Sequence, residues 1–177
     1  AAFAAYGPHN PALSRLAQDI AHWWITQGYF ARALPVLHSV LPHHPQPVEQ
    51  LAVMGTIARA AGGSGDRTLF RDAWDRCHDL LHHAGVDERA AQAMLDLAHG
   101  AASLALWDKA EDAARKALDV GSRRHEARIR LTAEALIESV RHHRVLEARK
   151  RAAQPEPVAA AEAQFAEELV RSLQIAG

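Results

Sequence analysis

Residues 20–45 read IAHWWITQGYFARALPVLHSVLPHHP, and this stretch indicates the fold most directly. Apolar and small residues recur at helical spacing on both sides of Gly28, and Pro42 and Pro45 close the stretch. Glycine commonly follows the last turn of a helix, and proline cannot continue one. The stretch therefore predicts one helix that ends at Gln27, a turn at Gly28, and a second helix that carries Ala33 to Leu41.

An aromatic residue followed by alanine three positions later recurs along the chain. The pairs are Phe30 and Ala33, Phe70 and Ala73, and Trp107 and Ala110. This spacing puts the ring and the methyl group on one face of a helix. A pattern that returns every few tens of residues indicates a repeat architecture, in which each hairpin buries its apolar face against the next.

The first hairpin resembles the tetratricopeptide repeat nearly position for position. Its large-small pair is Ile20-Ala21, its two aromatics are Trp24 and Phe30, and its turn glycine is Gly28. The small residue, the large residue and the closing proline are Ala33, Leu37 and Pro45. A second unit fits with Met54-Gly55, Ala58 and Gly62, followed by extra residues at GGSGDR (62–67). A third fits with Leu97-Ala98, Ala101, Ala105, Trp107 and Ala110, and the first helix of a fourth with Leu131, Thr132 and Ala135. The resemblance covers about three units over residues 13–140.

This resemblance implies an all-α fold, a right-handed superhelix of α-hairpins with about eight helices. We expect a single domain over residues 1–177, with repeat units at 13–46, 47–86 and 88–121, a partial unit at 122–153 and a capping helix at 157–175. The start contains no initiator methionine, since Met54 and Met94 are the two in the sequence. We therefore expect a trimmed chain or one domain of a longer protein.

Glycine and polar residues suggest where individual helices begin and end. We expect the third helix to end at Gly62-Gly63, and Gly62 to Asp66 to form a flexible loop. Asp66 or Thr68 is then the N-cap of the fourth helix, and Ser122 the N-cap of the seventh, because short polar side chains accept bonds from the first free amides of a helix.

Composition excludes several classes of protein. The formal net charge is −1, so the basic excess of a nucleic-acid-binding domain is missing and we expect no direct binding of nucleic acid. Apolar stretches fall far short of the roughly 20 residues that a membrane span needs. Cys77 is the one cysteine, which excludes an internal disulfide framework and favours a reducing, cytoplasmic setting. We expect its thiol to be buried and unreactive.

Twelve histidines raise the question of a metal site. His78 and His82 share a helix face and His83 adjoins them, but zinc needs three or four ligands and no H-E-x-x-H pattern is present. No Ser/His/Asp set, carboxylate pair or phosphate-binding glycine loop stands out either. We therefore expect no metal, no cofactor and no enzymatic activity, and a metal-dependent enzyme is the remote alternative.

Two features near the C-terminus have alternative interpretations. The basic run of Arg141, Arg144, Arg149, Lys150 and Arg151 suits the solvated end of a helix, and an acidic partner or nucleic acid is the alternative. The apolar stripe Phe165, Leu169, Val170 and Leu173 has the spacing of a helix face. It either covers the end of the array or docks on a second chain, which would make a homodimer.

In tetratricopeptide proteins the partner lies against the outward positions of each unit's first helix. By alignment these positions are Arg15, Gln18, Asp19, His22, Glu49, Val53, Thr56, Arg59, Gln92, Asp96, His99, Ser103, Glu126 and Arg130. Members that clamp a C-terminal carboxylate need lysine and asparagine at several of them. Gln18, His22, Val53, Gln92 and Asp96 stand there instead, which argues against that subclass.

These observations predict a module that binds a protein or peptide. Its expected setting is the sensor or interaction part of a larger bacterial protein, such as a transcriptional regulator or a secretion or assembly chaperone. The main alternative is a dimerising scaffold that uses the C-terminal helix.

Overall fold

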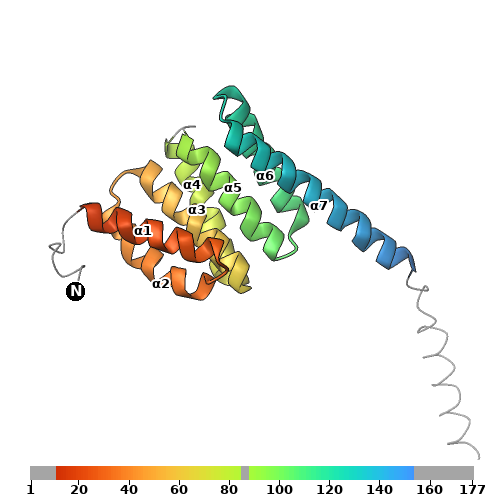
Figure 1. The fold of residues 1–177 in the computed structure, drawn as a ribbon, viewed down its shortest axis with the longest axis horizontal. Helices are drawn as coiled ribbons and strands as arrows, with labels where there is room; N and C mark the ends of the chain where they lie inside the picture. The colour runs from red at the N-terminus through yellow and green to blue at the C-terminus, as the bar shows by residue number, and fades with distance from the viewer. Residues whose placement is uncertain (1–10, 85–87, 154–177) are drawn as a thin grey trace, which may run out of the picture. The chain divides into compact units, whose positions relative to one another are not determined.

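The computed structural model describes residues 11–84 and 88–153 of the chain. Figure 1 shows the elements in chain order: α1 (Pro11–Thr26), α2 (Phe30–Val40), the short 3-10 helix η2 (Leu41–His43), α3 (Pro47–Ser64), α4 (Arg67–Ala84), α5 (Glu88–Ser103), α6 (Trp107–Arg123) and α7 (Ala127–Ala153). The described residues contain no strand, so the expectation of an all-α protein is confirmed.

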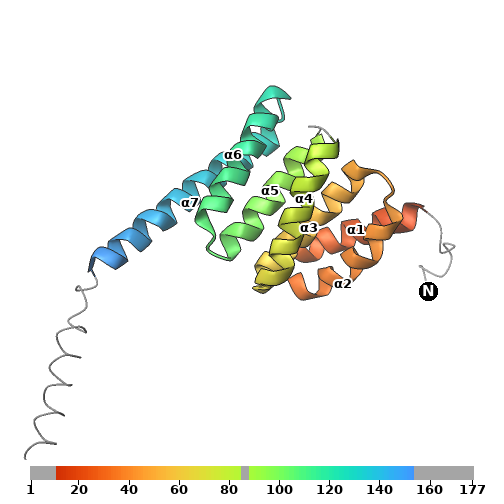
Figure 2. The same ribbon diagram turned by 180° about the vertical axis from the view of Figure 1, so that it is seen from behind.

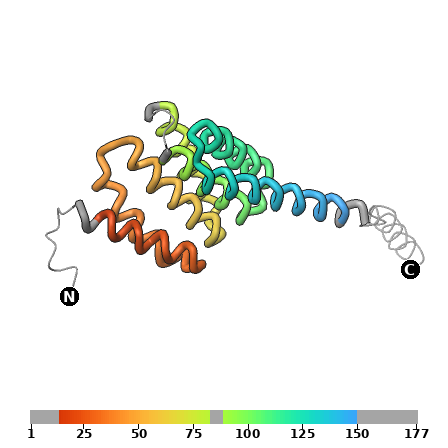
Figure 3. Tube along the Cα trace, turned by 45° about the horizontal axis from the view of Figure 1, so that its top comes forward, coloured from red at the N-terminus to blue at the C-terminus, as the bar shows by residue number. Residues whose placement is uncertain are grey.

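The chain divides into two units within α7, at Val140 and Arg141. In the first unit, α3 packs against α2, α4 and α5, and α5 packs against α6. Two opposite views place α3 between the α1–α2 hairpin and α5 (Figures 1 and 2). The tube in Figure 3 follows the same path, helix after helix, through this unit.

Four helix-to-helix turns have the same backbone geometry. Each holds one residue in the left-handed region: Gly28 (φ 80°), Gly65 (φ 81°), Ala105 (φ 57°) and His125 (φ 58°). The next amide donates to the carbonyl five residues earlier, at 2.8 or 2.9 Å: Tyr29 to Trp24, Asp66 to Ala61, Leu106 to Ala101 and Glu126 to Gly121. These bonds satisfy carbonyls that the end of a helix leaves free. The turn expected at Gly28 is therefore present and recurs three more times.

Helices α3 and α5 run parallel and approach closely along glycines. A Cβ added to Gly55 would lie 2.8 Å from Ala93 Cα, and one added to Gly62 would overlap the backbone of Gly100. Residues 55 and 62 face residues 93 and 100, two turns apart on each helix, so both helices point the same way. The close approach of α3 and α5 at these two positions brings the side chains that lie between them on the two helices into direct contact.

The core is built largely from small residues. Ala21, Ala33, Ala73, Ala98 and Ala110 are at most 1% exposed. Larger side chains such as Phe70, Leu37 and Ile57 fill the space between these contacts. Phe30 lies over Gly63, where a Cβ would stand 2.5 Å from the ring. The alanines and aromatics of the repeat pattern thus meet in one core.

The expected end of the third helix is wrong. Helix α3 continues through Gly62 and Gly63 to Ser64, with Gly65 as its C-cap, because Gly62 meets Gly100 and Gly63 meets Phe30 inside packed interfaces. The expected flexible loop over 62–66 is shorter in the structure, where Gly65 and Asp66 alone connect α3 and α4. Asp66 is the N-cap of α4, as predicted, since its Oδ1 accepts a 2.9 Å hydrogen bond from the Leu69 amide.

Helix α2 begins at Phe30, so Phe30 and Ala33 lie on one helix as expected, and it accommodates Pro35 in its interior. Two other helix boundaries differ from expectation. Helix α6 continues past Gly121, where a Cβ would stand 2.8 Å from the Ile129 side chain. Ser122 consequently lies inside α6 and is not the N-cap of the next helix. The turn comes at His125, and α7 begins at Ala127.

The first part of α7 is aligned differently from the predicted fourth unit. Its buried face consists of Ile129, Ala133, Ile137 and Val140. Leu131, predicted to be the large core residue of that unit, is 65% exposed. The error arose because helical spacing fits Leu131 and Ala135 as well as it fits the true core residues.

The predicted capping helix at 157–175 lies outside the described residues. Among the helices of the described part, none is long and apolar enough to cross a membrane.

Candidate functional site

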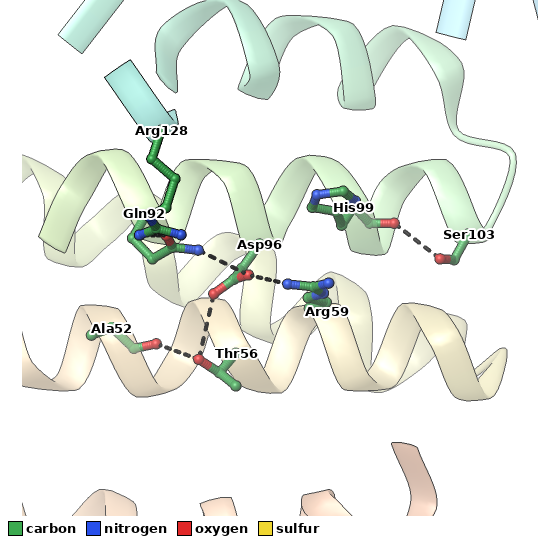
Figure 4. A network of polar contacts seen from close by, with 8 residues as sticks. All are labelled: Ala52, Thr56, Arg59, Gln92, Asp96, His99, Ser103 and Arg128. Atoms are coloured by element: carbon green, nitrogen blue, oxygen red, sulfur yellow. Dashed lines mark hydrogen bonds and ion pairs between the residues drawn. The ribbon is translucent and has the colours of Figure 1, made fainter. Parts of the chain in front are cut away.

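A carboxylate is buried between α3 and α5. Asp96, on α5, is 1% exposed. Its Oδ1 accepts hydrogen bonds from Arg59 Nη1 at 3.1 Å and from Gln92 Nε2 at 3.4 Å. Its Oδ2 accepts a long bond of 3.5 Å from the Thr56 hydroxyl. Figure 4 shows these side chains converging on Asp96. Arg59 therefore neutralises a charge that would otherwise be costly to bury.

Helix geometry places these groups together. Thr56 and Arg59 stand three residues apart on α3, and Gln92, Asp96 and His99 follow one another at steps of four and three on α5, so each set shares a face. The close glycine contacts of α3 and α5 then press the two faces together. The Thr56 hydroxyl also bonds the Ala52 carbonyl of its own helix at 3.0 Å.

Arg128 extends the network from the start of α7. Its Nη2 donates to Gln92 Oε1 at 3.0 Å (Figure 4). Gln92 thus connects Arg128 with Asp96, through its amide oxygen on one side and its amide nitrogen on the other. Arg128 was not predicted from the sequence, because the alignment of the fourth unit took the neighbouring Glu126 and Arg130 as the outward residues. Alignment of the fourth unit on the buried Ile129 would have drawn attention to the neighbouring Arg128.

Burial and charge control the protonation of two groups near Asp96. The pKa of His99 is lowered from its usual value of 6.5, first by burial and then by the positive charge of Arg59, while Asp96 partly opposes the shift. His99 is therefore neutral at pH 7. On α4, burial raises the pKa of the Cys77 thiol, and the negative charge of Asp96 raises it further. Cys77 is fully buried, as expected, and stays protonated.

A second cluster of charges lies near the first turn of α3. Glu49 pairs with Arg89 of α5 at 3.5 Å and with His44 at 3.6 Å. The Gln50 amide donates to the His44 carbonyl at 2.9 Å. This cluster joins the segment before α3 to α5, and Glu49 is its one member among the predicted groove residues.

Other predicted groove residues do not join the network. Val53 has no exposed surface, so it belongs to the core and cannot line a groove. Arg15, Asp19 and His22 are exposed on α1, and Gln18 is half-buried there. Ser103 bonds the His99 carbonyl of its own helix at 3.0 Å. Glu126 pairs with Arg124 at 2.8 Å, and Arg130 extends toward Gly121.

The predicted partner helix with Phe165, Leu169, Val170 and Leu173 lies outside the described residues. The pair His78 and His82 gains no further ligand, since no group of three or more His, Cys, Asp or Glu side chains within 11–84 and 88–153 could hold a metal ion. His78 instead stacks on Trp74, with ring centroids 4.9 Å apart.

The α3–α5 network offers hydrogen bonds and charge at a partly open surface. Arg59 is 24% exposed at its side chain, whereas Asp96 is 2% exposed, so the guanidinium and the neighbouring imidazole face outward and the carboxylate faces inward. The Thr56 hydroxyl lies within hydrogen-bond distance of the Ala52 carbonyl and of the Asp96 carboxylate, which Arg59 also holds. The arrangement suits recognition of a polar ligand. No family model, no curated protein and no solved structure matches this chain.

Proposed function

We propose that this chain is an interaction module of the tetratricopeptide type, and that it holds a peptide or a segment of another protein on the face formed by α3, α5 and the start of α7. We call this the network face and define it by Arg59, Gln92, His99 and Arg128. Binding rather than catalysis is its role in this proposal. The sensor or interaction part of a bacterial transcriptional regulator, or a secretion or assembly chaperone, is the setting that we propose.

The observation that carries the proposal is the buried Asp96. A carboxylate in a core contributes little to stability, because its desolvation offsets most of the attraction of its partner. A hydrophobic residue would hold α3 against α5 at least as well. Asp96 instead fixes the positions of Arg59 and Gln92, and through Gln92 that of Arg128. Polar groups fixed in this way lose little conformational entropy when a ligand binds.

The backbone supports the repeat interpretation. The same left-handed turn follows the first helix of each hairpin, at Gly28, Gly65 and Ala105. Parallel first helices, as α3 and α5 are, present equivalent faces side by side. Such a surface is suited to an extended segment that crosses several helices.

Peptide binding to the wild type and to two arginine variants tests the proposal. Fluorescent peptides selected from a random library are titrated into the wild type, into Arg128→Ala and into Arg115→Ala. Arg115 is the matched control, because it is an exposed arginine of α6 that bonds Glu111 one turn away. We expect Arg128→Ala to weaken binding about tenfold, the loss of about one charged hydrogen bond, and Arg115→Ala to leave it unchanged.

Equal affinity in all three proteins would exclude the network face as the binding surface. Arg59→Ala is a poor probe, since it leaves the buried Asp96 carboxylate without its cation and threatens the fold itself. Circular dichroism spectra and melting curves of the Arg128 and Arg115 variants establish that both remain folded.

A homodimer is a second candidate, favoured by exposed apolar side chains on the C-terminal part of α7. Val145 is 49% and Leu146 is 38% exposed. Light scattering on the wild type and on Val145→Ser/Leu146→Ser measures the mass of each. A dimer that becomes a monomer in the variant supports this candidate, and a monomeric wild type excludes it.

A further inference from the structure

Arg59 retains hydrogen-bonding capacity at the surface of the network face. A guanidinium carries five N–H groups. In the described part of the chain its acceptor is Asp96, which the Nη1 atom contacts at 3.1 Å. A quarter of the side chain, 24%, is open to solvent. The remaining donors are available to a ligand.

His99 stands next to this guanidinium, one turn after Asp96 on α5. In Figure 4 its ring overlies α5 above the Arg59 guanidinium, whose positive charge helps to lower the pKa of the ring after burial. Within the described residues neither ring nitrogen has a hydrogen-bond partner; the bond at this residue is made by its backbone carbonyl. The imidazole is thus a partly buried group whose ring nitrogens have no protein partner among the described residues and remain open to a ligand.

The charges that act on His99 come from two helices. Arg59 of α3 lowers its pKa and Asp96 of α5 raises it, and burial is the largest cause of the net decrease. The thiol of Cys77 on α4 stays neutral beside Asp96. Arg128 of α7 lies farther along the face, on Gln92. Asp96 balances the charge of Arg59, and Arg128 donates to the neutral amide of Gln92. These groups together carry one surplus positive charge while His99 is neutral.

We propose that the network face binds a carboxylate side chain, an aspartate or glutamate of a peptide, between Arg59 and His99, and that His99 takes up a proton from solvent as the carboxylate binds. This inference rests on the proposed function and names the chemistry of its ligand. The carboxylate accepts an N–H bond from Arg59 and one from the protonated ring. Its negative charge offsets the two causes that lower the pKa of the free ring, burial first and the positive charge of Arg59 second.

Linkage sets the expected pH dependence. Binding raises the pKa of His99, so affinity is lowest above the pKa of the complex, rises as the pH falls through it, and becomes constant below the pKa of the free protein. Each unit of difference between the two pKa values gives about a tenfold gain in affinity. Glutamate side chains titrate near pH 4.3, so the ligand stays charged over the range of interest.

A pair of short peptides tests the inference. The probe is acetyl-Glu-Ala-Glu-Ala-Glu-Ala-amide, whose only carboxylates are side chains, and the control peptide has glutamine in place of glutamate. Calorimetry in phosphate and in Tris buffer near pH 7 counts the protons taken up. We expect the glutamate peptide to bind with proton uptake, and about tenfold more tightly near pH 5.5 than near pH 8. The glutamine peptide should bind more weakly and without uptake.

Two histidine variants complete the test. In His99→Gln the proton uptake should vanish and the affinity should no longer depend on pH. In His38→Gln, which changes an exposed histidine on α2, both should match the wild type. Binding of the glutamate peptide without proton uptake would overturn the coupling between carboxylate binding and protonation of His99. Equal binding of both peptides, or binding of neither, would overturn the choice of a carboxylate ligand. If library peptides without acidic residues bind and respond to Arg128→Ala, this inference fails while the proposed function stands.

Discussion

Gly62 of α3 lies against Gly100 of α5 so closely that a Cβ on Gly62 would overlap the Gly100 backbone. Gly100 in turn faces Ala58, whose carbonyl oxygen would stand 2.5 Å from an added Cβ. Glycine normally weakens the middle of a helix by about 1 kcal/mol. Here the close approach that it permits holds together the two helices that carry the polar network.

We expect Gly62→Ala to destabilise the protein by about 2 kcal/mol, because overpacking at a backbone contact outweighs the gain in helix propensity. Urea unfolding followed by circular dichroism measures the change. Ser139→Ala, an exposed change on α7, is the control and should lie within about 0.5 kcal/mol of the wild type. A stabilised Gly62→Ala protein would mean that α3 and α5 are not in contact at this point.

The left-handed turns predict two substitutions with opposite effects. Ala105 has a φ of 57°, which costs an L-residue about 1 kcal/mol, so Ala105→Gly should stabilise the protein by up to about that amount. Gly28 has a φ of 80° and open space around its Cα, so Gly28→Ala should destabilise it by about 1 kcal/mol through the backbone alone. Melting temperatures of both variants test the pair. Shifts in the same direction would contradict a shared turn geometry.

Arg59 and Asp96 should contribute unequally to stability. Arg59→Met leaves a buried carboxylate without its cation, and we expect a loss of about 3 kcal/mol. Asp96→Asn leaves Arg59, which can reach water, and keeps an acceptor oxygen, so we expect a loss of about 1 kcal/mol. Chemical denaturation of both variants gives the comparison. Equal losses would indicate that Asp96 is as accessible to solvent as Arg59.

Cys77 should be inert in the folded protein. Its thiol is fully buried and its pKa is raised by burial and by Asp96, so the reactive thiolate is absent at neutral pH. We expect a chromogenic disulfide reagent to label Cys77 only as fast as the chain unfolds. The same reagent in concentrated urea supplies the reference rate for an exposed thiol. Rapid labelling under native conditions would place Cys77 at the surface.

Acid should destabilise the protein through His99. Its pKa in the folded state lies below the unfolded value of 6.5, so the unfolded chain binds the proton more readily. Stability from the neutral ring is therefore fully present above about pH 6.5 and is lost as the pH falls through that value toward the folded pKa. His99→Gln should lose less stability than the wild type between about pH 7.5 and 5.5, and His38→Gln should behave like the wild type. Denaturation curves at the two pH values give the differences, and identical acid sensitivity in all three proteins would assign the effect to other groups.

Local chemistry alone was enough to predict the helices and the first turn. The spacing of apolar residues indicated the helices, Gly28 marked a turn, and Asp66 was one of two N-cap candidates with Thr68, because these features depend on residues that are neighbours in the chain. The small residues expected to be buried, among them Ala33 and Ala110, are buried, since a repeat places them on the same face in each unit.

The tertiary structure decided which group of a neighbouring helix each residue contacts. Gly62 looks like a helix terminator in the sequence, yet it lies within α3 because the Gly100 backbone occupies the space that a side chain would need. Asp96 looks like one more polar residue on an outward face, yet it is buried, because α3 brings Arg59 against it. Arg128 joins the network through a bond to Gln92, a residue far away in the sequence. Periodicity assigns a residue to a face of its own helix, whereas the packing of helices determines whether that face meets solvent, a backbone or a charge.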